Sequence, residues 1–150
     1  MLSEAQDVVT KAVLVAFRQQ FFPQGQILVV SESRHPGFVS DASLVELGVT
    51  LHKRDDLPTV VIHSPKRSCL VLIDVAKLRG AMSARRREIL TEMFSGCKVR
   101  LVFVTAFMNR TEFSDLLAEP AWETVAWFAE EPNHLVHFDG RRLSGARRVT

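Results

Sequence analysis

One stretch constrains the fold of this chain more than any other: residues 57–77, LPTVVIHSPKRSCLVLIDVAK. Two runs rich in β-branched and apolar residues, 59–63 and 69–75, flank a polar Ser-Pro-Lys-Arg turn, and this pattern predicts a β-hairpin. The second run is almost wholly apolar until an acid, Asp74, occurs near its end. A carboxylate in a buried strand is costly unless it is paired, protonated or bound to a cation. Asp74 therefore marks either a functional site or a partly exposed acid that caps the next turn.

The composition predicts one globular domain over residues 1–150. A chain of 150 residues buries about two-thirds of its unfolded surface, and 47% hydrophobic with 24% charged residues is ordinary for a soluble protein. No apolar run is long enough to span a membrane, and the N-terminus, MLSEAQDVVTK, lacks the basic segment of a secretory signal. Cys69 and Cys97 have no metal-site spacing and are too few for a disulfide framework. We therefore expect a cytoplasmic protein with reduced thiols and no membrane partner.

The net charge of +2 conceals a clustering of bases. Between residues 77 and 100 seven bases stand against two acids, Glu88 and Glu92, and residues 140–150 carry four arginines and no acid. Arg85, Arg86 and Arg87 fall in the first turn of a predicted helix, where the helix dipole disfavours cations. A nearby anion would account for them. The clustering is compatible with a polyanion partner and equally with a solvated basic face.

Hydrophobic periodicity, caps and turn residues place the other elements. A first helix is predicted over 4–21, a strand over 26–31, and a loop over 33–40 in which 37–39 could pair briefly. The remaining predictions are a short helix capped by Asp41 and closed by Gly48, a helix from an N-cap at Ser83 to about Ser95, a strand over 98–105, a helix from Asn109 or Thr111 through Leu117, and strands over 123–128 and 134–138. This order predicts an α/β (α+β) fold with a central mixed β-sheet flanked by helices.

Several stretches resemble a known family. They include LVFVTAFMNRTEF at 101–113 and AWETVAWFAEEPNHLVHFDG at 121–140. Upstream, ELGV at 46–49, Leu57-Pro58, Leu72-Ile73-Asp74 and MFSGC at 93–97 follow the same pattern. On these residues, from the first helix to about Gly140, the chain resembles the catalytic domain of the BsuBI/PstI family of type II restriction endonucleases.

The resemblance implies a restriction-endonuclease-like fold of the PD-(D/E)xK group. Such proteins hydrolyse phosphodiester bonds of double-stranded DNA with Mg²⁺, typically as homodimers on palindromic sites. Acids that converge on the cation place it beside the scissile phosphate, where it activates the attacking water and neutralises developing charge. A β-hairpin suits this chemistry because its strand ends bring such acids together.

Carried over residue by residue, the family's metal site matches this sequence in part. The family's first metal acid falls on Thr59, so that carboxylate is missing, and its second, a Glu, falls on Asp74. Glu32 keeps an acid after the first strand. The resemblance thus implies Asp74 and Glu32 as metal ligands and Asp74, Glu32 and Thr59 as the catalytic positions. Asp56 lies nearby in sequence, although the intervening Pro58 restricts its approach.

The bases after the hairpin are the candidate DNA-binding residues: Lys77, Arg79, Arg85, Arg86 and Arg87. They would contact phosphates, which gives affinity and salt dependence rather than sequence reading. We interpret His52, His63, His134 and His137 as structural rather than zinc-binding, and both tryptophans, Trp122 and Trp127, as core.

Three hypotheses follow from the sequence. The chain is a Mg²⁺-dependent DNA endonuclease with a degenerate site, a catalytically inactive DNA-binding module, or a protein-interaction subunit of a restriction or defence system. Mg²⁺-dependent DNA cleavage that is lost in Asp74→Ala would favour the first. Salt-sensitive DNA binding that is unaffected by Asp74→Ala would favour the second, and no DNA affinity at low salt would leave the third.

Overall fold

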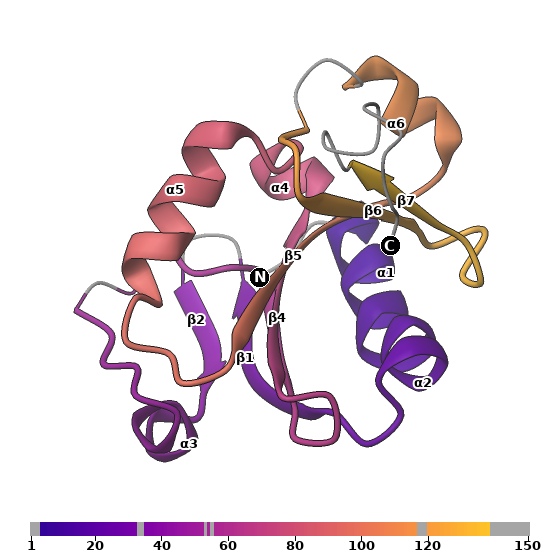
Figure 1. Cartoon of the computed structure of the whole chain (residues 1–150). Coiled ribbons are helices and arrows are strands. Elements are labelled where there is room, and N and C mark those ends of the chain that lie inside the picture. Colours follow the sequence, from indigo (N-terminus) through magenta and orange to yellow (C-terminus); the bar gives the residue numbers. More distant parts are fainter. Residues whose placement is uncertain (1–3, 33–34, 53, 55, 117–119, 139–150) are drawn as a thin grey trace, which may run out of the picture.

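The computed structural model describes residues 4–32, 35–52, 54, 56–116 and 120–138 (Figure 1). The helices are α1 (Glu4–Ala12), the π-helical turn η1 (Val13–Phe17), α2 (Arg18–Phe21), α3 (Asp41–Glu46), α4 (Ala76–Arg79), α5 (Ala84–Met93) and α6 (Arg110–Asp115). The strands are β1 (Gln26–Glu32), β2 (His35–Val39), β3 (Val60–Ser64), β4 (Cys69–Val75), β5 (Arg100–Phe107), β6 (Thr124–Phe128) and β7 (Leu135–Phe138). The four arginines between residues 141 and 148, which the sequence analysis counted among the clustered bases, lie outside the described residues.

The described strands form one mixed sheet in the order β2-β1-β3-β4-β5-β6-β7. The pairs from β2 to β4 are antiparallel, β4 and β6 run parallel to β5 between them, and β7 returns antiparallel to β6. Strand β4 lies at the middle of the sheet, and all seven of its residues are buried. The structure confirms the predicted central mixed sheet with flanking helices.

The predicted hairpin is present as β3 and β4. Its register runs from Val60 opposite Ile73 to Ser64 opposite Cys69. Beyond the last pair, Thr59 and Asp74 follow at the open end of the hairpin, away from the turn. Because side chains alternate along a strand, Asp74 points to the same face of the sheet as Leu70 and Leu72.

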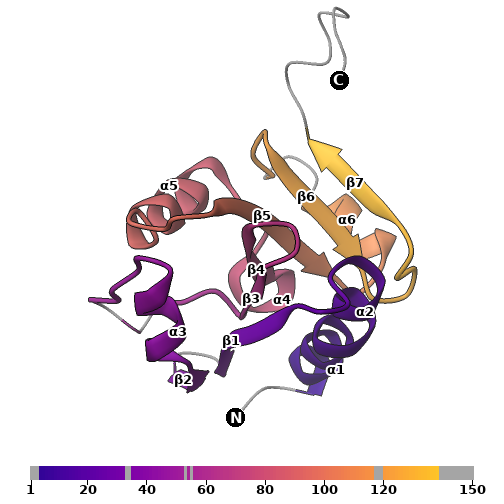
Figure 2. The same ribbon diagram turned by 60° about the horizontal axis from the view of Figure 1, so that its bottom comes forward.

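Each face of the sheet is covered by helices (Figures 1 and 2). On one face, α1 and η1 pack Val9, Val13 and Phe17 against the odd-numbered residues of β4. On the other face, Leu44 of α3, Leu90 of α5 and Phe94 at the end of α5 pack against Leu70 and Leu72. Asp74 therefore faces α5. This arrangement decides which side chains can reach its carboxylate.

The N-terminal helix spans 4–21 as predicted, but it contains a π-helical turn, η1. Its side chains Val13 and Phe17 are buried, and the Phe17 ring contacts Trp127 edge-on with centroids 5.3 Å apart. Arg18 Nε donates to the Leu14 carbonyl at 3.0 Å, which satisfies an acceptor within the π-helical turn. Because one face of the helix is buried, its apolar residues recur at helical spacing, and this spacing predicted the helix from the sequence.

Several boundaries differ from the sequence-based prediction. Most of 33–40 was expected to be loop, but β2 pairs with β1 from Val39 back to His35, and β1 extends to Glu32. Ser40, not Asp41, is the N-cap position of α3. The short helix α4 was not predicted. Strand β5 runs from Arg100 to Phe107 instead of 98–105, because its parallel register with β4 continues past Asp74.

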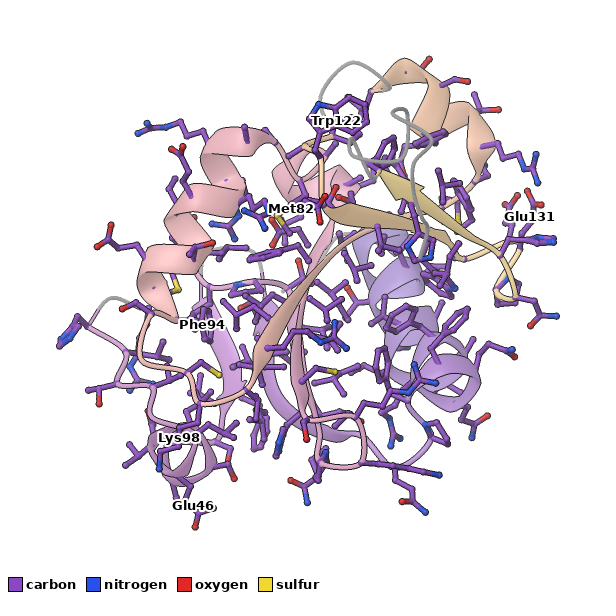
Figure 3. The ribbon with its side chains drawn as sticks, viewed as in Figure 1. Glu46, Met82, Phe94, Lys98, Trp122 and Glu131 are labelled. Carbon is purple, nitrogen blue, oxygen red and sulfur yellow. The ribbon has the colours of Figure 1, made fainter. Side chains whose placement is uncertain are left out.

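Two glycines join α3 to the end of α5. Gly48 has a φ of +92°, and a Cβ at Gly96 would collide with the Gly48 carbonyl oxygen. The backbone of Lys98 donates to the Leu47 carbonyl at 2.7 Å, which fastens the same crossing. Figure 3 shows Phe94 and Lys98 along this connection, which leads from α5 into β5. The crossing thereby fixes the segment that follows α5 against the end of α3.

Candidate functional site

The candidate site lies at the open end of the hairpin, on the face that α5 covers. Asp74 is fully buried there, and so is Thr59 on the neighbouring strand end. On the other side of β4, Thr105 of β5 stands directly beside Asp74 in the parallel register. Three neighbouring strands thus present one acid between two threonines to the underside of α5.

Both threonines use their hydroxyl groups to fix backbone. Thr59 Oγ1 accepts a hydrogen bond from the Val75 amide at 3.0 Å, and Thr105 Oγ1 accepts one from the Met82 amide at 2.8 Å. Met82 lies two residues before α5 begins, where the chain passes from α4 to that helix (Figure 3). The Thr59 hydroxyl therefore holds the end of the hairpin, and Thr105 positions the chain that enters α5.

Arg86 is the partner of Asp74. Its Nε lies 2.7 Å from Asp74 Oδ2 and its Nη2 lies 3.1 Å from Asp74 Oδ1, so the guanidinium grips the carboxylate with two parallel hydrogen bonds. Asp74 is fully buried and Arg86 is only 9% exposed. A planar guanidinium matches a carboxylate in this two-point geometry better than an ammonium group does. The buried acid that the sequence singled out is therefore charge-compensated by an arginine.

The same guanidinium also holds the loop that leads into the hairpin. Nη1 donates to the Asp56 carbonyl at 3.0 Å and lies 3.1 Å from the Asp56 carboxylate, while Nη2 contacts the Leu57 carbonyl at 3.4 Å. With the two bonds to Asp74, each of the five N–H groups of Arg86 faces an oxygen. Arg86 thus joins α5, the strand β4 and the loop before β3 through one side chain.

Electrostatics keep this guanidinium charged. Burial acts to lower the pKa of Arg86, but the hydrogen bonds and charges of Asp74 and Asp56 outweigh it and raise the pKa above its ordinary value. The guanidinium therefore stays charged beside the Asp74 carboxylate. A cation at the first turn of α5, unfavourable on its own, is offset by the buried acid beneath it.

Local sequence explains how Arg86 reaches inward. Ser83 caps α5, because its hydroxyl accepts the Arg86 amide at 3.1 Å. With the helix started there, Arg86 and Leu90 are four residues apart and face the sheet together, and both are buried. Arg85 points to solvent and is exposed. The predicted cap at Ser83 is confirmed, and it sets which of the three arginines enters the core.

The other candidate DNA-binding residues lie around this end of the sheet. Lys77, in α4, is exposed. Arg87 is half-buried with its guanidinium carbon 4.7 Å from the centre of the Phe103 ring, and its Nε has no hydrogen-bond partner among the described residues. Only the backbone of Arg79 is described. Phosphate contact by these bases, and by Arg86, stays a prediction.

Glu32 ends β1 next to the hairpin. The residue before it, Ser31, donates its amide to the Thr59 carbonyl and its hydroxyl to the Pro58 carbonyl, both at 2.8 Å. These bonds place the end of β1 beside Pro58 and Thr59 at the open end of the hairpin, with β3 between β1 and the strand of Asp74. The side chain of Glu32 lies outside the described part of the structure.

The described residues do not fit a divalent metal ion at this site. Both Asp74 oxygens are engaged by Arg86, and Thr59 offers a neutral hydroxyl that already accepts a backbone amide. Among the residues that the structure describes, no group of three or more His, Cys, Asp or Glu could hold a metal ion. A bound guanidinium already fills the position beside Asp74 that such an ion needs.

The two tryptophans differ in burial. Trp127 is buried as predicted, but the prediction for Trp122 was wrong: it is 66% exposed, in the turn directly before β6 (Figure 3). His134 lies on the surface, 3.4 Å from the Glu131 carboxylate. Both cysteines are free thiols, and no described helix is long and apolar enough to cross a membrane.

Two residues of the site, Thr105 and Asp56, were not predicted to belong to it. Thr105 is a polar residue near the end of an otherwise apolar strand, as Asp74 is in β4, and this similarity could have indicated that the two lie side by side. Asp56 was weighed as a residue that Pro58 restrains, yet it reaches the same guanidinium as Asp74. The sequence signal for Arg86 was the unfavourable interaction of a cation with the helix dipole in the first turn of a helix. That signal did not distinguish a buried acid of the chain from an external anion.

Comparison with known proteins identifies the class. A family model for the BsuBI/PstI restriction endonuclease domain matches residues 1–141, and the chain belongs to that family. The solved structure of SdaI restriction endonuclease superposes with a TM-score of 0.85 at 34% identity, covering 94% of this chain and 45% of that one. The fold is therefore that of a restriction endonuclease.

Two curated relatives agree. Type II restriction enzyme BsuBI of Bacillus subtilis is 33% identical over 136 residues, which is 90% of this chain and 43% of that protein. Type II restriction enzyme AplI of Arthrospira platensis is 30% identical over 143 residues, 90% of this chain and 44% of that protein. The chain thus spans less than half the length of each of these relatives.

Proposed function

We propose that this chain is a restriction-endonuclease-like domain that binds double-stranded DNA and does not itself cleave it at the hairpin site. Membership of the BsuBI/PstI restriction endonuclease family over residues 1–141 carries the first half of the proposal, because duplex DNA is the substrate of such enzymes. The ion pair of Asp74 with Arg86 carries the second half. The single domain over 1–150, the homodimer and the cytoplasmic location stay predictions.

The DNA contact is expected along the rim formed by α4 and the start of α5. Lys77 and Arg85 are exposed there, on the two elements that follow β4. Both are free to meet phosphate oxygens without breaking the buried pair beneath them. Because phosphate contacts release counterions, this mode of binding gives a strong dependence on salt and little dependence on sequence.

The test is fluorescence anisotropy of a labelled duplex at increasing salt. We expect log Kd to rise linearly with log salt concentration. Replacing both Lys77 and Arg85 by alanine should lower that slope by about 2, since each lost phosphate contact removes about 0.9. Lys66→Ala is the control, because Lys66 is exposed in the turn at the opposite end of the hairpin. No binding at low salt would instead support the protein-interaction hypothesis.

Mg²⁺-dependent hydrolysis of duplex DNA, with Thr59 in place of the first metal acid, is the second candidate. The backbone position of Glu32 favours it, because β1 ends beside Pro58 and Thr59, at the open end of the hairpin. Nicking of supercoiled plasmid in Mg²⁺ or Mn²⁺, with EDTA as control, separates the candidates. Cleavage that disappears in both Asp74→Asn and Glu32→Gln would establish the enzyme, and no cleavage alongside salt-dependent binding would establish the binding domain.

A further inference from the structure

We propose that the Arg86 guanidinium is the resident cation of an all-oxygen cation cage at the open end of the hairpin. The cage stays closed to divalent metal ions as long as this side chain occupies it. The inference concerns the folded chain alone and holds whether or not the domain binds DNA. It assigns to Arg86 the place that a bound metal ion would otherwise take.

The cage is made of oxygens only. Five atoms surround the guanidinium at 2.7–3.4 Å: Asp74 Oδ1, Asp74 Oδ2, Asp56 Oδ1, the Asp56 carbonyl oxygen and the Leu57 carbonyl oxygen. Two carboxylates and two backbone carbonyls are the donors that hard divalent cations prefer. The two carboxylates come from separate elements, yet they converge on a single positive group.

Charge explains why the cage needs an occupant. Asp74 is fully buried, and the Asp56 side chain is 45% exposed, so at least one of the two charges has no access to water. An unpaired buried carboxylate is strongly unfavourable. The guanidinium supplies the opposite charge, and because it is part of the chain it does not lose the translational entropy that a dissolved ion loses on binding. A dissolved metal ion must displace it, together with five hydrogen-bonding contacts. The wild-type cage is therefore insensitive to free metal ions.

Removing the Arg86 guanidinium should allow the oxygens of the cage to bind a divalent cation. In Arg86→Ala the Asp74 carboxylate loses its guanidinium partner and the Asp56 carboxylate loses its contact with the same guanidinium. The backbone carbonyls of Asp56 and Leu57 should keep their places in the loop. We expect Mn²⁺ or Ca²⁺ to stabilise this variant in a saturable way. At a cation concentration about a hundred times Kd, the midpoint of thermal unfolding should rise by about 5–10 °C.

The experiment compares thermal unfolding of four proteins with and without millimolar Mn²⁺ or Ca²⁺. Wild type and the exposed neighbour variant Arg85→Ala should show no shift, Arg86→Ala should show the rise, and Arg86→Ala with Asp74→Asn should lose it. A rise in wild type that Asp74→Asn abolishes would overturn the inference, because the cage would then admit metal with Arg86 present. So would a folded Arg86→Ala that does not respond to either cation.

A second arm covers the case in which Arg86→Ala does not fold. Arg86→Lys keeps a positive charge on the same backbone position, so this variant should fold and remain indifferent to Mn²⁺. Titration calorimetry of wild type with Mn²⁺ needs no variant, and should detect no saturable site. A Mn²⁺-dependent rise in Arg86→Lys, or one Mn²⁺ bound per wild-type chain, contradicts the inference.

Discussion

Replacing Arg86 by methionine tests the buried ion pair most sharply. Methionine replaces the apolar stem of the side chain but removes the guanidinium with all five N–H donors. Asp74, fully buried, would be left without its partner, and removal of one member of a buried pair typically costs about 3–5 kcal/mol. We therefore expect Arg86→Met to lose about 3–5 kcal/mol of unfolding free energy.

Urea unfolding followed by tryptophan fluorescence measures this loss. Trp127 is fully buried and reports on the core, and the exposed Trp122 adds a constant background. The double variant Asp74→Ala with Arg86→Met removes both charges and should recover most of the stability, giving a coupling energy of about 2–4 kcal/mol. Arg85→Met, exposed in the same helical turn, should change stability by less than about 0.5 kcal/mol. A loss below about 1 kcal/mol for Arg86→Met, or a double variant as unstable as the sum of the two single variants, would show that the ion pair does not stabilise the fold.

Three further predictions follow from single contacts. Thr59→Val keeps the shape but deprives the buried Val75 amide of its acceptor, so urea unfolding should show a loss of about 1–3 kcal/mol, and an unchanged midpoint would contradict that role. Gly96→Ala pushes a Cβ against the Gly48 carbonyl and should cost about 1–3 kcal/mol by the same assay, whereas Ser95→Ala next to it should be neutral. Burial raises the pKa of the Cys69 thiol, against smaller opposing effects of Arg100 and Arg67, so a thiol reagent at neutral pH should modify the partly exposed Cys97 first and Cys69 only on unfolding; equal rates would refute this order.

The elements with strong local signals were predictable from the sequence. The hairpin of β3 and β4 follows from two β-rich runs around a polar turn, and the helix over 4–21 from a long apolar periodicity. Boundaries that depend on partners were not. Strand β2 forms because β1 offers it a free edge, and β5 extends to Phe107 because β4 continues beside it. Such registers are properties of the sheet and not of either strand alone.

The site shows the same limit. Asp74 was recognisable as an acid that needed compensation, and Arg85–Arg87 as cations that needed an anion. Which of the three arginines turns inward depends on the exact start of α5 and on the face of the sheet that Asp74 occupies. Neither fact is local. The buried acid and the cation in the first turn of α5 are each unfavourable alone, and they compensate each other as an ion pair. This pairing can be seen only in the folded chain.

Trp122 was assigned to the core because large aromatic side chains are usually buried. Its neighbours instead place it before β6, where Ala121 donates its amide to the Met82 carbonyl at 2.8 Å and the side chain is left outside. The position of a loop residue depends on such backbone contacts between distant segments. Residue type alone was not enough to predict it.

In this structure the Asp74 carboxylate is held by the Arg86 guanidinium and not by a metal ion. Anomalous diffraction from crystals grown in excess Mn²⁺ can distinguish the two, because manganese is identified by its own signal. We expect no anomalous peak at coordinating distance from Asp74, with the guanidinium bound to both carboxylate oxygens. A manganese peak on Asp74, shared with Glu32 or Asp56 and with Arg86 displaced, would show that a metal ion holds the carboxylate instead.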